Sequence, residues 1–194
     1  EKIGGEMYEL LTMANRTTED VFSLLDNLLK WTKSQIGNLN VVYQDVDAVE
    51  VVDSVIDVFN MVAGLKKITI REEKPEKLPV CTDIDMLKTI IRNLLSNAIK
   101  FSNENSEVLV KMEEQGDTVV VSVKDSGCGI DEEGQQKLLH TDTHFSTFGT
   151  NNEEGSGLGL LLCQDFAVKI GGKLWFTSKE GEGSTFYFSI PLKK

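Results

Sequence analysis

Residues 92–101, RNLLSNAIKF, carry a hydrophobic pattern that requires a helix with one buried face. Their apolar side chains recur at the three- and four-residue spacing of a single helix face: Leu94, Leu95, Ala98 and Ile99. Thr82 or Asp83 is predicted to cap this helix, because a short polar side chain there accepts hydrogen bonds from the first free amides.

The opposite face of the same helix has an unusual composition. Asn93, Asn97 and Lys100 occupy positions i, i+4 and i+7, which aligns two amides and one ammonium in a single stripe. Amide oxygens bind hard cations and an ammonium binds phosphate, so the stripe suits an oxygen-rich, negatively charged ligand. On this segment alone, an ordinary amphipathic helix is the alternative.

A glycine-containing segment, DSGCGI, follows a predicted strand at residues 125–130. Gly127 and Gly129 allow the backbone to approach a ligand closely and to adopt positive φ angles. Asp125, at the strand end, is suited to accept a hydrogen bond from an exocyclic amine such as that of adenine. A plain β-turn is the alternative, since Asp-Ser-Gly is also ordinary turn chemistry.

Two further glycine-containing segments occur downstream. Residues 155–160, GSGLGL, open a predicted helix, where free amide N–H groups and the helix dipole favour a phosphate. The Rossmann pattern is not met, because a long polar stretch rather than a strand precedes these residues. Residues 181–186, GEGSTF, join two predicted strands and are also compatible with a simple hairpin turn.

The rest of the chain predicts strands and helices that mix without βαβ alternation. Apolar spacing predicts helices over about 45–62, 131–139 and 157–170, and strands at 41–43, 68–71, 78–81, 107–112, 118–124, 173–178 and 185–190. Residues 140–155 are polar and without periodicity, which is typical of a lid or binding loop. The fold class is expected to be α+β, with a layer of sheet and a layer of helices.

A long helix is predicted to precede this domain, over about residues 6–39. Its apolar side chains keep a heptad-like spacing: Met7, Leu10, Ala14, Val21, Leu24, Leu28 and Trp31. So wide an apolar face needs packing partners, and a helical bundle with helices from outside this chain is favoured. Packing on its own domain is the alternative.

Charge and cysteine content narrow the functional classes. The formal net charge of −11 argues against a general nucleic-acid binder and against docking on an anionic membrane. Three scattered cysteines without CxxC spacing suit a reduced, cytoplasmic setting. No apolar run approaches the roughly 18 residues of a membrane span, and no signal peptide is visible. Because residue 1 is Glu rather than Met, the chain is expected to be a piece of a longer protein.

Taken in order, the segments resemble the ATP-binding domain of sensor histidine kinases, a branch of the Bergerat-fold ATPases shared with gyrase, a heat-shock chaperone and mismatch-repair proteins. Residues 93–101 resemble the N box of that family, 125–130 its first glycine box, 155–160 the second and 181–186 the closing one, and Phe145 with Phe148 resembles a reduced F box. The likeness covers about 41–194 and implies a two-layer sandwich, a mixed sheet with helices on one face. Residues 1–40 resemble the second helix of the dimerisation and phosphoacceptor hairpin.

The resemblance implies a role for each matching residue. Asn97 would be the Mg²⁺ ligand, Lys100 a phosphate contact and Phe101 a ring against the adenine, while Asp125 would bind the adenine amine. The other residues expected at the nucleotide site are Asn93, Gly127, Gly129, Ile130, Gly155, Gly157, Leu158, Gly159 and Thr185. No catalytic residue beyond these binding residues is expected in this chain.

Position 93 separates the branches of the family. Members of the family that hydrolyse ATP have a Glu four residues before the metal-binding Asn, and so do the serine-directed and dehydrogenase-directed kinases of this fold. That Glu activates a water or hydroxyl as a general base. Asn93 is an amide and cannot accept a proton at neutral pH. This favours phosphoryl transfer to a nucleophile activated elsewhere over ATP hydrolysis.

The basic residues depart from the family pattern. After Lys137 the next Lys or Arg is Lys169, so the expected lid lacks the cation that family lids often place on the γ-phosphate. The transferring phosphate is then expected to rely on Mg²⁺, Lys100 and the backbone. His140 and His144, the only histidines, fall in this lid; a metal site made from them with a cysteine is disfavoured, because CxxC and carboxylate spacing are missing.

The expected function is that of a protein-histidine kinase fragment. In the intact homodimer, Mg²⁺-ATP would give its γ-phosphate to a histidine upstream of residue 1, and the receiver domain of a response regulator would then accept it. No autophosphorylation is expected from these residues alone. Two alternatives stay open: an ATPase or serine kinase of the same fold, and a degenerate nucleotide-binding module with an interaction role.

Overall fold

The computed structural model describes residues 18, 21, 25, 28–30, 32, 40–138, 149–150 and 157–192. By its internal contacts the chain divides into residues 1–39 and residues 40–194, and each unit is described by itself. The described residues of the first unit are helical, within the helix predicted over 6–39. The rest of that predicted helix, like most of the predicted lid, lies outside the described residues.

The second unit contains a five-stranded sheet with the strand order β2-β4-β5-β7-β6. β2 pairs with β4 in parallel, and the other neighbours are antiparallel, so the sheet is mixed. A separate two-stranded antiparallel sheet joins β1 to β3. The strands are β1 (Gln44–Asp47), β2 (Thr69–Glu73), β3 (Pro79–Thr82), β4 (Glu107–Gln115), β5 (Thr118–Lys124), β6 (Leu174–Lys179) and β7 (Gly183–Pro191).

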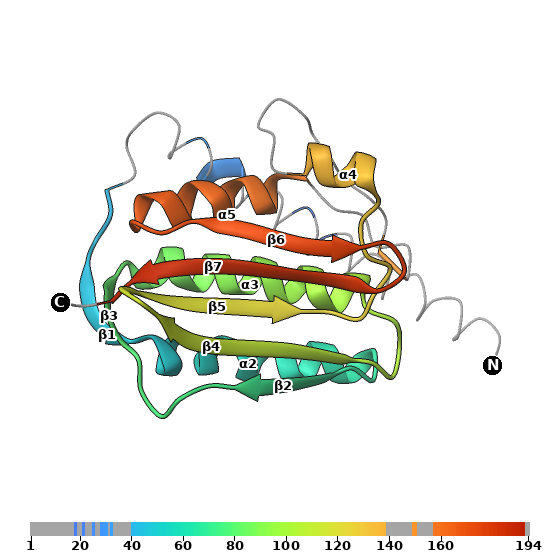
Figure 1. Cartoon of the computed structure of the whole chain (residues 1–194), viewed down its shortest axis with the longest axis horizontal. Helices are drawn as coiled ribbons and strands as arrows, with labels where there is room; N and C mark the ends of the chain where they lie inside the picture. The colour runs from blue at the N-terminus through green and yellow to red at the C-terminus, as the bar shows by residue number, and fades with distance from the viewer. Residues whose placement is uncertain are drawn as a thin grey trace. The chain divides into compact units, whose positions relative to one another are not determined.

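Helices cover one face of the five-stranded sheet. They are α2 (Ala48–Leu65), α3 (Ile84–Phe101) and α5 (Leu158–Lys169), with a short α4 (Glu132–Lys137) after β5. Figure 1 shows α2, α3 and α5 on the same side of the sheet, and α3 packs against both of the other two. The predicted α+β class, a mixed sheet with helices on one face, is confirmed.

The core lies between these two layers. Val123 pairs with Val110 on one side and with Phe186 on the other, and paired residues point to the same face of a sheet. All three side chains are buried, whereas Ser122, one position earlier, points to the opposite face. From the helix layer, the predicted apolar face of α3 is buried as expected: Leu94, Leu95, Ala98 and Ile99.

The ends of α2 differ from the sequence-based prediction. Residues 41–43 are not a strand, and the expected helix start at residue 45 lies within β1 instead. Asp47 is the N-cap, so the helix begins at Ala48, and it ends at Leu65, three residues later than predicted. Gly64 does not stop the helix, because the left-handed position after the helix is taken by Lys67, with φ of 55°.

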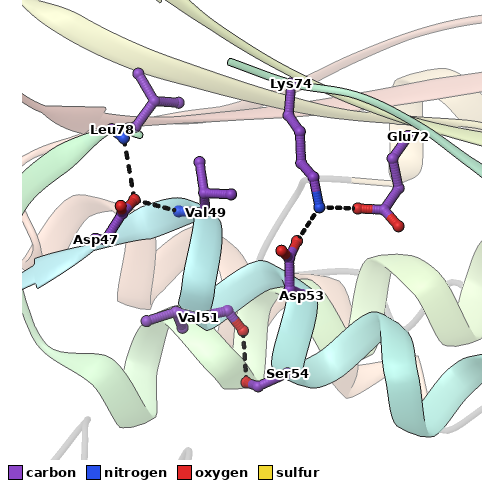
Figure 2. Close-up of polar contacts among 8 residues, drawn as sticks. All are labelled: Asp47, Val49, Val51, Asp53, Ser54, Glu72, Lys74 and Leu78. Atoms are coloured by element: carbon purple, nitrogen blue, oxygen red, sulfur yellow. Dashed lines mark hydrogen bonds and ion pairs between the residues drawn. The ribbon is translucent and has the colours of Figure 1, made fainter. Parts of the chain in front are cut away.

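Asp47 connects α2 to β3 through one carboxylate oxygen. Figure 2 shows that Asp47 Oδ1 accepts hydrogen bonds from the backbone N–H of Val49 and from that of Leu78, both at 3.0 Å. The same view shows the Lys74 ammonium between the carboxylates of Asp53 and Glu72, at the edge of the same helix. Asp47 therefore caps the helix and fixes the start of the strand that leads to α3.

Among the described residues, none of the helices combines the length and the apolar character that a bilayer crossing requires.

Replacing Asp47 with Ala should lower the free energy of unfolding by about 1–2 kcal/mol, because two backbone donors lose their acceptor. Asp47→Asn keeps an acceptor oxygen and should recover most of this loss in urea denaturation. Ser54→Ala is the control on the same helix: the Ser54 hydroxyl only donates to the Val51 carbonyl within the helix, and its loss should cost less than about 0.5 kcal/mol. Equal losses for Asp47→Ala and Ser54→Ala would contradict the capping role.

Candidate functional site

The helix that carries the polar stripe, α3, is held at its first turn by Asp83. Asp83 Oδ1 accepts from the backbone N–H groups of Asp85 and Met86, both at 3.0 Å, and Oδ2 accepts from Val42 N–H at 2.8 Å. Asp83 rather than Thr82 is thus the N-cap. The start of α3 is fixed both to its own first turn and to the segment before β1.

The last turn of α3 contacts the first glycine box through main-chain atoms. A Cβ on Gly127 would lie 2.0 Å from the carbonyl oxygen of Phe101, so any other residue at position 127 would collide with backbone. The N–H of Cys128 points at the same carbonyl, with an N–O distance of 3.4 Å. Glycine at 127 is therefore required by the close approach of this loop to α3.

Asp125 follows directly on β5 and is only 4% exposed. Its Oδ1 accepts from Gly127 N–H at 2.9 Å and from Ser184 N–H at 3.2 Å. Neither of these two N–H groups donates to Oδ2. Burial raises the pKa of Asp125 above its ordinary value, and the N–H groups of Gly127 and Ser184 offset part of this rise. One oxygen orients the carboxylate, and the other is left for a donor such as a ligand amine.

The closing glycine box, residues 181–186, packs against the first glycine box, residues 125–130. A Cβ on Gly183 would lie 2.2 Å from the carbonyl oxygen of Asp125, and a Cβ on Gly129 would lie 2.0 Å from that of Lys179. Both glycines also have positive φ angles, +96° and +65°. Thr185 pairs with Lys124 in the β5–β7 register, next to Asp125. Residues 181 and 182 lie in the hairpin turn between β6 and β7, residues 183–186 begin β7, and Gly183 packs against the first glycine box.

The amide of Ile130 is held from β6. Its N–H donates to Ser178 Oγ at 2.9 Å, and this hydroxyl lies 2.9 Å from Ser184 Oγ. Both serines contact predicted site residues, but neither was predicted from the sequence to belong to the site. Ser184 could have been identified from its position inside the closing glycine box. Ser178 lies on a strand, outside any motif, and nothing in the sequence around it indicates a role in the site.

The second glycine box meets α3 near the other end of the stripe. Gly157 is the N-cap of α5 with φ of +68°, and Leu158 begins the helix. A Cβ on Gly159 would lie 2.5 Å from Asn93 Oδ1, while Asn93 Nδ2 donates to the Thr89 carbonyl at 2.9 Å. Gly155 lies outside the described residues, as do Phe145, Phe148, His140 and His144.

Asn97 lies between these two contact points on α3. Asn93, Asn97 and Phe101 are successive members of one i, i+4 row, so Asn97 is about 6 Å along the axis from each neighbour. Asn97 is half-buried, and the Lys100 ammonium lies 4.8 Å from the centroid of the Phe101 ring. The polar stripe therefore runs from the second glycine box to the first.

The described residues contain no cluster of three His, Cys, Asp or Glu side chains that would hold a metal ion by itself. A single amide such as Asn97 fits a different kind of site. Mg²⁺ keeps several waters and usually takes only one or two protein ligands, with the phosphates of its partner nucleotide supplying others.

Comparisons with known proteins identify the family and the fold of this chain. The profile of the family described as histidine kinase-, DNA gyrase B- and HSP90-like ATPase matches residues 82–194. The chain is 30% identical over 171 residues to the adaptive-response sensory kinase SasA of Rippkaea orientalis, covering 87% of this chain and 43% of that protein.

Two solved structures have the same fold. The catalytic domain of the histidine kinase ThkA is 31% identical with a TM-score of 0.68, covering 78% of this chain and 96% of that one. ThkA in complex with its response regulator protein TrrA is 24% identical with a TM-score of 0.75, covering 95% of this chain and 51% of that one.

The fold and the family match define an ATPase-type nucleotide-binding domain. The chain belongs to the histidine kinase-, DNA gyrase B- and HSP90-like ATPase family, and it is homologous to sensor histidine kinases. It spans less than half the length of the SasA kinase that it matches.

The buried carboxylate of Asp125 should make this domain less stable as the pH rises. Because its folded-state pKa lies above the ordinary 3.8, it stabilises the fold below that value and the contribution is lost as the pH rises through the folded pKa. Asp125→Asn removes this titration. In urea denaturation from about pH 4 to about pH 7, the free energy of unfolding of Asp125→Asn should therefore rise relative to that of the wild type.

Asp117→Asn, in the exposed β4–β5 turn, supplies the baseline for replacing an acid by its amide. If the free energy of unfolding of Asp125→Asn, relative to that of the wild type, falls or stays level over this pH range, burial does not raise the pKa of this carboxylate.

Proposed function

We propose that this chain is the ATP-binding catalytic part of a protein-histidine kinase. It binds Mg²⁺-ATP between α3, the loop after β5 and the start of α5. In the intact protein, the γ-phosphate passes to a histidine upstream of this chain and then to an aspartate of a response regulator. The observation that carries the proposal is the Asn93–Asn97–Phe101 row, which contacts one glycine box at each end.

The adenine end of the site is assigned to the loop after β5. Asp125 Oδ2, to which neither Gly127 nor Ser184 donates, suits the exocyclic amine of adenine. Gly127, Gly129 and Ile130 shape the loop around the base, with Thr185 beside it on β7. Phe101 supplies an aromatic ring at the end of α3.

The phosphate end is assigned to the start of α5. The start of α5, at Gly157, Leu158 and Gly159, is the positive end of the helix dipole, which favours phosphate oxygens. Lys100 contributes an ammonium, and Asn97 contributes an amide oxygen for Mg²⁺. Asn97 would hold Mg²⁺ there, and the ion would supply positive charge next to the phosphates.

Position 93 supports transfer rather than hydrolysis. Asn93 cannot act as a general base, and its Nδ2 is engaged by the Thr89 carbonyl. The protein therefore binds and orients the nucleotide, while the accepting imidazole supplies the nucleophile. ThkA, whose complex with a response regulator has been solved, supports a receiver domain as the later acceptor.

The leading helix supports a dimeric arrangement of the intact protein. Residues 1–40 are proposed as half of a dimerisation hairpin, ahead of an ATP-binding domain at 41–194. The described apolar side chains of that helix are exposed: Val21, Leu25, Leu28 and Leu29. A second copy of the hairpin is the partner that would bury them.

The function is tested with a chain extended upstream to include the hairpin and its histidine, incubated with γ-labelled ATP and Mg²⁺. The expected result is an acid-labile, base-stable phosphate on the protein, lost when that histidine is replaced. Inorganic phosphate release without labelled protein would indicate an ATPase. Nucleotide binding with neither outcome would indicate an interaction module.

Asn97→Ala should remove the Mg²⁺-dependent part of nucleotide affinity. In titrations with a nonhydrolysable ATP analogue, affinity with Mg²⁺ should fall about tenfold or more, while affinity without Mg²⁺ stays close to that of the wild type. Asn60→Ala, an exposed asparagine on α2, is the matched control and should change neither value. Unaltered Mg²⁺-dependent affinity in Asn97→Ala would remove Asn97 from the metal site.

A further inference from the structure

A buried lysine neutralises the carboxyl end of α3. The last carbonyls of a helix have no partner within the helix, and a cation placed there is favoured by the helix dipole. The Lys66 ammonium donates to the carbonyl of Ile99 at 3.1 Å and to that of Lys100 at 2.8 Å. Lys66 is only 7% exposed, so its ammonium is largely removed from water and is stabilised by hydrogen bonds to these carbonyl oxygens.

The turn after α2 positions the Lys66 side chain at the carboxyl end of α3. Ile68 N–H donates to the Ala63 carbonyl at 2.9 Å and Lys67 N–H to the Gly64 carbonyl at 3.1 Å, the pair of bonds that defines a Schellman motif. Lys67 takes the left-handed position and points to the surface, where it pairs with Glu104 at 3.7 Å. Two adjacent lysines thus have opposite environments.

The third acceptor of Lys66 comes from a distant part of the chain. Its ammonium donates to Thr150 Oγ1 at 2.6 Å, in addition to the two carbonyl oxygens of α3. Thr150 is also held by its own N–H, which donates to the Lys100 carbonyl at 3.2 Å. Its hydroxyl lies 3.1 Å from that carbonyl and 2.8 Å from the carbonyl of Ser102, and can donate to one of them at a time.

We propose that Lys66 and Thr150 are positioning residues for the nucleotide site. Lys66 fixes the last turn of α3 and joins it to Thr150, which lies between the F-box Phe148 and the second glycine box in the sequence. Neither residue is assigned a contact with the nucleotide. The inference rests on the proposed function and extends it to residues that determine where the site residues lie.

The consequence for the site follows from the contacts of that last turn. The same turn bears Lys100 and Phe101, and the Phe101 carbonyl is the atom against which Gly127 packs. A shift of the turn by a few tenths of an ångström would therefore move the first glycine box as well as the phosphate-binding lysine. The Lys66 ammonium controls this turn because it binds two of its carbonyl oxygens directly.

The test is a double-mutant cycle on the affinity for a nonhydrolysable ATP analogue with Mg²⁺, using the full chain. Lys66→Met keeps the apolar stem and removes the charge, and Thr150→Val keeps the shape and removes the hydroxyl. Expected losses of affinity are about tenfold for Lys66→Met, about fivefold for Thr150→Val and still about tenfold for the double variant, because both residues hold the same last turn of α3.

Two matched variants separate positioning from general destabilisation. Lys67→Met removes the neighbouring exposed ammonium and should leave the affinity unchanged. Thr150→Ser restores a hydroxyl and should recover the wild-type affinity. Losses that multiply to about fiftyfold in the double variant, or wild-type affinity in both single variants, would overturn the proposal.

Amide hydrogen exchange without nucleotide gives an independent readout. Lys66→Met should speed exchange at Ser102, whose N–H donates to the Ala98 carbonyl, and at Thr150, while Lys67→Met should not. If the wild type binds no nucleotide, the proposed function fails and this exchange result alone decides whether Lys66 holds the turn. Unchanged exchange at both amides would contradict the inference.

Discussion

Main-chain contact between the last turn of α3 and the loop after β5 is the constraint on which the other features depend. The space between the Phe101 carbonyl and position 127 admits no Cβ, and the same holds between Lys179 and position 129 and between Asp125 and position 183. Three loops far apart in the sequence thereby pack backbone to backbone. This close packing places backbone amides and one carboxylate oxygen at the proposed adenine end, beside the Phe101 ring.

Much of this arrangement was predictable from local chemistry. The amphipathic period of α3, a cap at Thr82 or Asp83 and the strands that became β4 and β5 follow from residue spacing, and the structure confirms each, with Asp83 as the cap. The parallel pairing of β2 with β4 and the β1–β3 pair were not predicted, because strand partners depend on tertiary packing and carry no local signal.

The contact between Lys66 and Thr150 could not be predicted from the sequence for a similar reason. In Leu65-Lys66-Lys67 nothing local distinguishes the buried lysine from the exposed one, and the turn that separates them places a non-glycine residue at positive φ. The predicted roles of Asn97 and Lys100 stay predictions. An acidic chain of net charge −11 binds an anion only if local amides, Lys100 and a cation offset the wider field, and the glycine boxes provide such amides.

The central claim is that a nucleotide binds where the glycine boxes meet α3. Amide NMR spectra of the isotope-labelled chain, titrated with a nonhydrolysable ATP analogue and Mg²⁺, test this directly. Shifts are expected to concentrate at Asn97, Gly127, Gly129 and Gly159, with the amides of Asp117 and Leu192 at the far end of the sheet unchanged. A folded chain whose spectrum does not respond, or responds chiefly at that far end, would contradict it.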